Sequence, residues 1–90
     1  MITLRIKKKF FDQIVSGEKI TEFRSFSNYY KNLFSKNPTY LKLHYQEKIA
    51  LIVEISKIEI YSKQETGFES EFITTEKYFK IELGRVYLTV

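Results

Sequence analysis

Three side chains with complementary chemistry lie close together in the first third of the chain: Lys19, Glu22 and Arg24. An arginine guanidinium can hold a phosphate or a base edge through two parallel hydrogen bonds, and a lysine ammonium attracts phosphate as a point charge. A carboxylate beside them can accept a hydrogen bond from an exocyclic amine or a ribose hydroxyl. The three residues are therefore candidates for a site that binds RNA or a nucleotide.

Two other interpretations suit the same side chains. In the first, Glu22 and Arg24 pair with each other as a structural salt bridge, and Lys19 is solvated. In the second, Lys19 and Glu22 act as the acid and base of a small hydrolase or nuclease that uses RNA or a modified nucleoside. The residue types alone do not decide between binding, structure and catalysis, so whether the chain is an enzyme stays open.

The elements before these residues predict how they are presented. Apolar and polar residues alternate over residues 2–7, which is the period of a strand with one buried face. Apolar residues then recur at the spacing of one helix face, at Phe11, Ile14 and Val15. Gly17 follows as a left-handed C-terminal cap, a conformation that glycine adopts at little steric cost.

A second strand is expected from about Ile20. Its period of two places Glu22 and Arg24 on one face and turns Thr21 to the other. Lys19 lies at the corner between the helix and this strand. We therefore expect the two cations and the carboxylate to line one concave site.

The rest of the chain predicts mostly strands. Ser27 or Asn28 can cap a second short helix, and Asn37-Pro38 ends it. The polar stretch 62–76 is expected to be a long loop with one helical turn. Further strands are expected at residues 41–45, 49–61, 79–83 and 86–90. Together with the two earlier strands and two short helices, this pattern predicts an α+β fold, a small mixed six-stranded β-barrel.

The long strand 49–61 carries an irregularity in its pattern. Apolar residues mark one face up to Ile55, whereas Ile58 and Ile60 mark the opposite one. A regular strand cannot change faces, so a bulge or bend is expected between about Ser56 and Ile58. Such an irregularity lets a small sheet curl into a barrel.

Composition bounds the class of protein. Ninety residues suit one domain over residues 1–90, and 43% hydrophobic residues are enough for one core. Because the chain has no cysteine and only one histidine, His44, no disulfide, metal site or cofactor is expected. The longest apolar run, Ile49–Val53, is too short to span a bilayer, and no secretory signal pattern is present. A cytoplasmic protein without a membrane partner is expected.

The charge is concentrated in the first half of the chain. Residues 1–48 carry ten Lys/Arg and four Asp/Glu, a net charge of +6. Residues 49–90 carry five Lys/Arg and seven Asp/Glu, a net charge of −2. Such an excess suits a polyanionic partner, because binding phosphates releases counterions, although lysine-rich proteins are also simply soluble.

Other residues could extend the candidate site. Lys7 begins a lysine triplet that could contact phosphates, although a basic first helical turn is usually only solvated. Tyr29 lies with Phe26 and Tyr30 just after Arg24, where aromatic rings could stack on bases. Such rings also pack in cores, and the sequence leaves both roles open. Lys7 and Tyr29 are the additional candidate binding residues.

A family resemblance rests on the segment 17–24, which reads Gly-Glu-Lys-Ile-Thr-Glu-Phe-Arg and fits the pattern G-x-K-x-x-E-x-R. It follows a predicted strand at 4–7 and a predicted helix at 10–16, and this order resembles the opening of ASCH domains. The segment 79–84 resembles the closing strand of small ASCH proteins. The resemblance implies a PUA-like barrel with a cleft beside the motif. It also implies functions such as RNA binding or transcriptional coactivation, and one branch of the family hydrolyses acetylated cytidine.

One departure from the family pattern bears on catalysis. In the hydrolase branch, a threonine three residues after the motif lysine resembles the nucleophile, but this chain has Glu22 there. Thr21 is adjacent, yet alternation turns it to the opposite face of the strand. The resemblance therefore implies binding rather than amidohydrolysis, and no catalytic residue is assigned.

The leading prediction is a domain that binds RNA or a nucleotide through Lys19, Glu22 and Arg24. These residues do not distinguish RNA from DNA. One alternative is an enzyme that uses the same cleft. Another is a protein-interaction module, such as a small mobile-element protein that binds a host factor through its aromatic surface.

Overall fold

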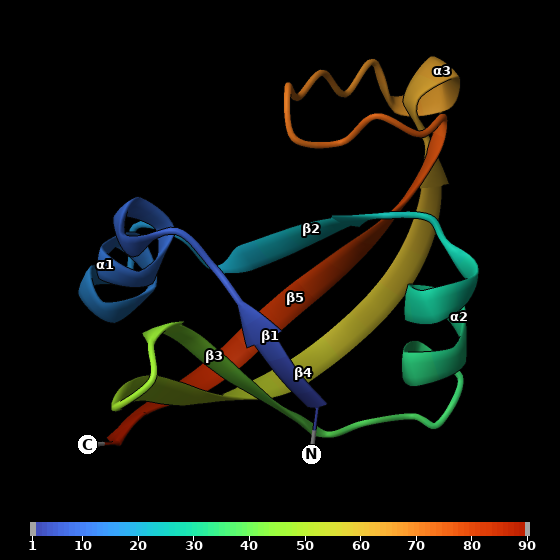
Figure 1. The fold of residues 1–90 in the computed structure, drawn as a ribbon. Coiled ribbons are helices and arrows are strands. Elements are labelled where there is room, and N and C mark those ends of the chain that lie inside the picture. The colour runs from blue at the N-terminus through green and yellow to red at the C-terminus, as the bar shows by residue number, and fades with distance from the viewer. Residues whose placement is uncertain (1, 90) are drawn as a thin grey trace.

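One curled, mixed sheet forms the framework in a computed structural model that describes residues 2–89 (Figure 1). The elements are β1 (Ile2–Arg5), α1 (Lys8–Ser16), β2 (Thr21–Ser25), α2 (Asn28–Phe34), β3 (Tyr40–Gln46), β4 (Ile49–Ser62), α3 (Lys63–Thr66) and β5 (Lys77–Thr89). The strand order is β1-β3-β4-β5-β2. β1 pairs with β3 in parallel, and the other neighbours are antiparallel. The fold is thus α+β, with five strands in a half-barrel and three short helices.

The last strand corrects the expected number of strands. The sequence pattern predicts two strands at 79–83 and 86–90, but Lys77–Thr89 is one continuous strand, and Val90 lies outside the described residues. Gly84 marks a bulge inside this strand rather than a turn. A Cβ on Gly84 would lie 3.2 Å from the Cβ of Glu54, so glycine allows the close approach of β4 there. Residues 2–89 therefore form five strands instead of six.

The irregularity expected in β4 is confirmed: one register shift includes Ser56, within the predicted range, and another lies just before it. The pairing of β4 with β5 shifts register between Val53 and Ile55 and again between Ile55 and Lys57. Ile55 and Ile58 both pack against the core, although they are an odd number of residues apart. The shift therefore moves the inward face of the strand from one set of alternating residues to the other.

Helix α1 buries the face that its apolar spacing predicts, with one exception. Phe11 and Ile14 are buried, but Val15 is exposed. Gly17 has a φ of 85° and donates its N–H to the carbonyl oxygen of Ile14, as a left-handed cap should. The cap turns the chain directly into Lys19 and the second strand.

Helix α2 begins with a side-chain cap and leaves one of its tyrosines outside. The Oγ of Ser27 accepts a hydrogen bond from the Tyr30 backbone N–H at 3.2 Å. Phe34 is buried and Tyr30 packs against the core, whereas the neighbouring Tyr29 is 62% exposed. Asn37 adopts a φ of 52° just before Pro38, which ends the helical segment.

In residues 2–89 no helix is long and apolar enough to cross a bilayer.

The segment between β4 and β5 folds back along the sheet through aromatic contacts. It begins with the short helix α3, the third helix of the fold. Phe68 stacks on Tyr78 with ring centroids 4.5 Å apart, and Phe72 makes an edge contact with Phe10 at 5.6 Å. Ile73 is buried, and its carbonyl oxygen accepts a hydrogen bond from Lys63. These anchors hold residues 67–76 against the N-terminal part of the fold.

A carboxylate at the base of this segment predicts a local pH dependence. The Oε1 of Glu76 accepts hydrogen bonds from the Ser62 hydroxyl at 2.6 Å and the Gln64 backbone N–H at 2.8 Å. These bonds hold the pKa of Glu76 below its usual value. Because the folded pKa is lowered, the stabilisation is present above the unfolded pKa of about 4.3 and is lost as the pH falls through the folded pKa.

We therefore expect the amide proton of Gln64 to shift in an NMR titration with an apparent pKa below the usual glutamate value. Glu76→Gln keeps an acceptor oxygen but does not titrate, so this variant should lose the acidic transition at Gln64. A Gln64 transition that persists in Glu76→Gln would show that another group causes it.

Candidate functional site

The motif residues open onto a cleft between the N-terminal strand and the second strand. The cleft has a cavity volume of about 430 Å³ and is walled by residues of β1, α1, β2, α2 and the 67–76 segment. Glu22, Arg24 and Lys7 line it together with Phe10. An adjoining pocket of about 290 Å³ is lined by Lys19 and shares Glu22, Phe10 and other wall residues with the first. Both cavities therefore meet at the same carboxylate.

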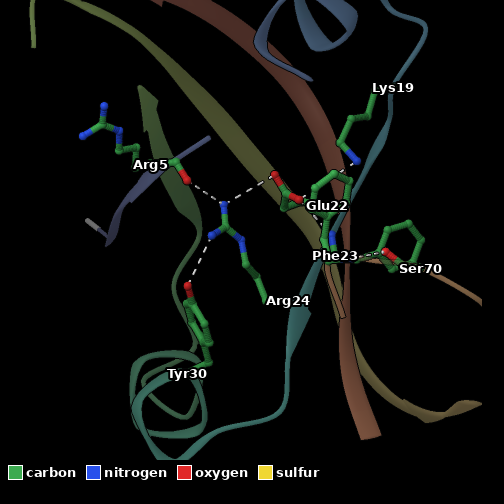
Figure 2. A network of polar contacts seen from close by, with 8 residues as sticks. Arg5, Lys19, Glu22, Phe23, Arg24, Tyr30 and Ser70 are labelled. Carbon is green, nitrogen blue, oxygen red and sulfur yellow. Dashed lines mark hydrogen bonds and ion pairs between the residues drawn. The ribbon is translucent and has the colours of Figure 1, made fainter. Parts of the chain in front are cut away.

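Glu22 is the buried centre of this cleft, with only 6% of its surface exposed. Its Oε1 accepts a hydrogen bond from the Phe23 backbone N–H at 3.0 Å and lies 4.0 Å from the Nζ of Lys19. Its Oε2 lies 3.7 Å from the Nη2 of Arg24 (Figure 2). Within residues 2–89, Oε2 accepts no hydrogen bond. A buried carboxylate is costly unless it is compensated, and here two cations supply the compensation.

Arg24 connects the two outer strands of the half-barrel. Its Nη2 donates a hydrogen bond to the carbonyl oxygen of Arg5 in β1 at 3.1 Å, and its Nη1 donates to the hydroxyl of Tyr30 in α2 at 3.2 Å (Figure 2). Its Nε is buried and, in the described part of the chain, has no hydrogen-bond partner. The Arg24 side chain extends from β2, and its contacts with β1 and α2 fix the orientation of the guanidinium.

The lysines of the cleft lie against aromatic walls. The Nζ of Lys19 is 5.2 Å from the ring centroid of Phe10 and 5.5 Å from that of Phe23. The Nζ of Lys7 is 4.4 Å from the ring centroid of Phe72. Cations within about 6 Å of a ring face are attracted by its quadrupole. Lys7, Lys19 and Arg24 outnumber the two carboxylates that line these cavities, Glu22 and Glu69, so an excess of positive charge remains.

The structure brings together four of the five predicted binding residues. Glu22, Arg24 and Lys7 line the cleft, and Lys19 lines the adjoining pocket that shares Glu22 with it. Tyr29 is placed elsewhere: it points outward into a shallow pocket with Ile2 and Leu33. Its neighbour Tyr30 contacts Arg24 instead, because Tyr30 lies on the face of α2 that packs against the core.

The structure contains both features that the sequence offered as alternatives. Glu22 and Arg24 form a salt bridge, and the same two residues line the cleft. The expectation of a solvated Lys19 does not hold, since its side chain is only 17% exposed and lies near Glu22. The aromatic walls formed by Phe10 and Phe72 were not expected from the sequence pattern. Phe72 is one of three apolar residues, with Phe68 and Ile73, in an otherwise polar stretch, and such residues are the signal that points to docking.

Thr21 does not line the cleft. Thr21 pairs with Glu82 of β5 and lies on the face of β2 opposite to Glu22. Among residues 2–89, no group of three or more His, Cys, Asp or Glu side chains gathers to hold a metal ion.

Comparisons of the chain with protein-family models, with curated proteins and with solved structures found no match.

Proposed function

We propose that this chain is a PUA-like domain of the ASCH type that binds RNA or a nucleotide in the cleft around Lys19, Glu22 and Arg24. The observation that carries the proposal is the convergence of Lys7 and Arg24 on an aromatic-walled cavity of about 430 Å³, with Lys19 in the adjoining pocket that shares Glu22. A volume of this size lies in the range of small-ligand sites. A cytoplasmic location, where RNA and nucleotides are abundant, is part of the proposal.

The chemistry of the cleft matches an anion attached to a flat ring. Arg24 presents a guanidinium that is already oriented by Tyr30 and the Arg5 carbonyl, which suits a phosphate. Phe10 and Phe72 offer aromatic surface on which a base can stack. Glu22 holds the cations in place and can accept a hydrogen bond from an amine or a ribose hydroxyl.

The pairing of two distant segments supports the family part of the proposal. The motif strand β2 and the segment 79–84 carry the resemblance, and they come from opposite ends of the chain. They lie side by side in the sheet, where Arg24 pairs with Phe79 and Glu22 pairs with Ile81. Pairing of the motif strand with the closing strand is compatible with the proposed ASCH-like barrel, because a barrel closes by pairing strands that are distant in sequence.

The proposal predicts that Arg24 is needed for binding. We expect the protein to bind a short fluorescent single-stranded RNA at low salt, and Arg24→Ala to weaken this binding at least about tenfold, as expected for a charge-assisted fork. The matched control is Lys8→Ala, because Lys8 is exposed and paired with Asp12 at 2.8 Å outside the cleft; it should change affinity less than about twofold. Anisotropy titrations and unfolding curves of each variant measure affinity and folding.

Two further measurements sharpen this test. If three phosphates of a single strand contact cations, affinity should fall with salt at a log–log slope of about −2. Arg24→Lys keeps the charge but loses the fork, so it should recover only part of the affinity. RNA recovered intact after long incubation is the expected result for binding without hydrolysis. No binding at low salt, or binding indifferent to Arg24→Ala, would refute the proposal and favour a protein-interaction module.

A further inference from the structure

The outward side of the sheet carries an unusual patch near β1. The buried residues Leu4, Leu43 and Leu51 face the core, so their sequence neighbours face outward. Strand register then aligns Thr3 with Lys42, Lys42 with Ile52, and Ile52 with Tyr87 across four strands. We call this patch the outer basic face and define it by Arg5, Tyr40, Lys42, His44, Ile52 and Tyr87.

The cations of the outer basic face differ from those on the far half of the same sheet. On the far half, Lys57 pairs with Glu59 at 3.3 Å and Lys80 pairs with Glu82 at 3.9 Å, so the charges there cancel. On the outer basic face, Arg5 and Lys42 form no ion pair with any residue in the range 2–89. Two positive charges on this face are therefore available to an external anion.

One acidic residue lies beside the outer basic face. Glu54 pairs in register with Tyr40, and its Oε1 accepts a hydrogen bond from the Arg85 backbone N–H at 3.0 Å. This bond occupies one of its oxygens at the bulge. With Arg5 and Lys42 against Glu54, the charge of the face remains positive.

Aromatic surface lies beside these free cations. Tyr87, near the end of β5, is 45% exposed, and Tyr40, the first residue of β3, is 38% exposed. Within the described residues, neither ring packs on another ring. Exposed rings that alternate with unpaired cations on a sheet are the arrangement that single-stranded nucleic acids use, with bases on the rings and phosphates on the cations.

Arg5 makes the outer basic face continuous with the cleft. Its carbonyl oxygen accepts the hydrogen bond from Arg24 inside the cleft, while its side chain extends away from that guanidinium (Figure 2). β1 is thus the shared rim of both surfaces. From β1 to Tyr87 on β5 the face spans three strand spacings, roughly 14 Å.

We propose that the outer basic face is a second binding surface, over which a single-stranded RNA held in the cleft continues across β1. Arg5 and Lys42 contact its phosphates, and Tyr40 and Tyr87 stack on its bases. This inference rests on the proposed function and adds that the ligand is an oligonucleotide several residues long rather than a free nucleotide.

Ligand length separates the two surfaces in an experiment. We expect unstructured RNA of 12 nucleotides to bind at least about tenfold more tightly than RNA of 4 nucleotides, as measured by anisotropy at one fixed salt concentration. Lys42→Ala combined with Tyr87→Ala should weaken binding of the 12-mer about tenfold, because stacking on one base alone corresponds to roughly a 5-fold to 150-fold change. The same pair should change binding of the 4-mer less than about twofold.

Control variants identify the chemistry of the contact. Lys57→Ala removes an exposed but paired lysine from the far half of the sheet and should leave both affinities unchanged. Tyr87→Phe keeps the ring and should bind the 12-mer like the unaltered protein. Lys42→Ala alone should reduce the steepness of the log–log salt dependence for the 12-mer by about 0.7, the value for one phosphate of a single strand.

The outcomes distinguish this inference from the proposed function. If binding depends on Arg24 but not on RNA length, the proposal that RNA binds the outer basic face is wrong, and the proposal that RNA binds in the cleft is retained. A length effect that Lys42→Ala and Lys57→Ala reduce equally also overturns it. Failure of both RNAs to bind removes both proposals. If Tyr87→Ala instead converts a dimer to a monomer in sedimentation, the face is an interface between copies of this chain, and the RNA inference is wrong.

Discussion

Phe79→Ala is expected to lower the free energy of unfolding by about 3–5 kcal/mol, the range for a large ring removed from a well-packed core. Phe79 is buried on β5, where its ring stacks on Phe26 at 5.3 Å and meets Phe34 edge-on at 4.9 Å. These contacts tie α2 to the sheet. Urea unfolding followed by circular dichroism measures the loss.

The site should be affected through α2. Tyr30 stacks on Phe34 at 5.8 Å and in turn holds the guanidinium of Arg24. When the ring of Phe79 is lost, Phe34 loses a supporting wall, and the hydrogen bond from Arg24 to Tyr30 should weaken. We therefore expect Phe79→Ala to reduce RNA affinity at temperatures where the variant is still folded.

The matched control for this variant is its partner in the strand register. Ile60 pairs with Phe79 across β4 and β5 but is 53% exposed. Ile60→Ala should therefore change stability by about 0.5 kcal/mol or less, as is usual for surface positions. Similar losses for Phe79→Ala and Ile60→Ala would mean that burial does not set the cost here and would contradict the prediction.

Glu22→Gln is expected to destabilise the fold by about 1–3 kcal/mol. The glutamine has nearly the same shape and can still accept the hydrogen bond from the Phe23 backbone. It removes the negative charge, so Lys19 and Arg24 are left on either side of a neutral group in a largely buried site. Thermal and urea unfolding at low ionic strength measure the effect, because salt screens it.

Glu22→Gln should also respond to added anions, which a simple loss of stability would not predict. Inorganic phosphate should raise the unfolding temperature of the variant more than that of the unaltered protein, because the anion supplies the missing negative charge and binds only the folded state. Glu82→Gln is the control, since the side chain of Glu82 is partly exposed and paired with Lys80 at 3.9 Å, and it should change stability by about 0.5 kcal/mol or less. Equal phosphate effects in both variants would rule out an anion site between Lys19 and Arg24.

Local patterns in the sequence determine the elements that present the site. The cap at Gly17 and the alternation through Glu22 and Arg24 depend on residues only a few positions apart. Their geometry follows from backbone sterics and from the period of two in a strand, so both could be predicted. The slip in alternation within β4 is also local, and one of the two register shifts includes Ser56, where the pattern predicts an irregularity.

Contacts between distant residues decided what local patterns could not. Residues 77–89 form one strand because β4 pairs with them on both sides of Gly84, whereas the local pattern at this glycine resembles a break. Tyr30 rather than Tyr29 meets Arg24 because packing of α2 on the core sets the rotation of the helix. These outcomes depend on register and packing, which adjacent residues do not encode.

In the candidate site, too, some features follow from local spacing and others from tertiary contacts. That Glu22 and Arg24 share a face is a property of their spacing, since two residues in a strand always point the same way. That Arg24 reaches the Arg5 carbonyl, and that Phe72 closes the wall beside Lys7, required the sheet to curl and the 67–76 segment to fold back. The sequence alone therefore determined which groups stand together on one strand, and only the tertiary structure decided that they would be buried, paired and enclosed, because burial depends on what the rest of the chain places over them.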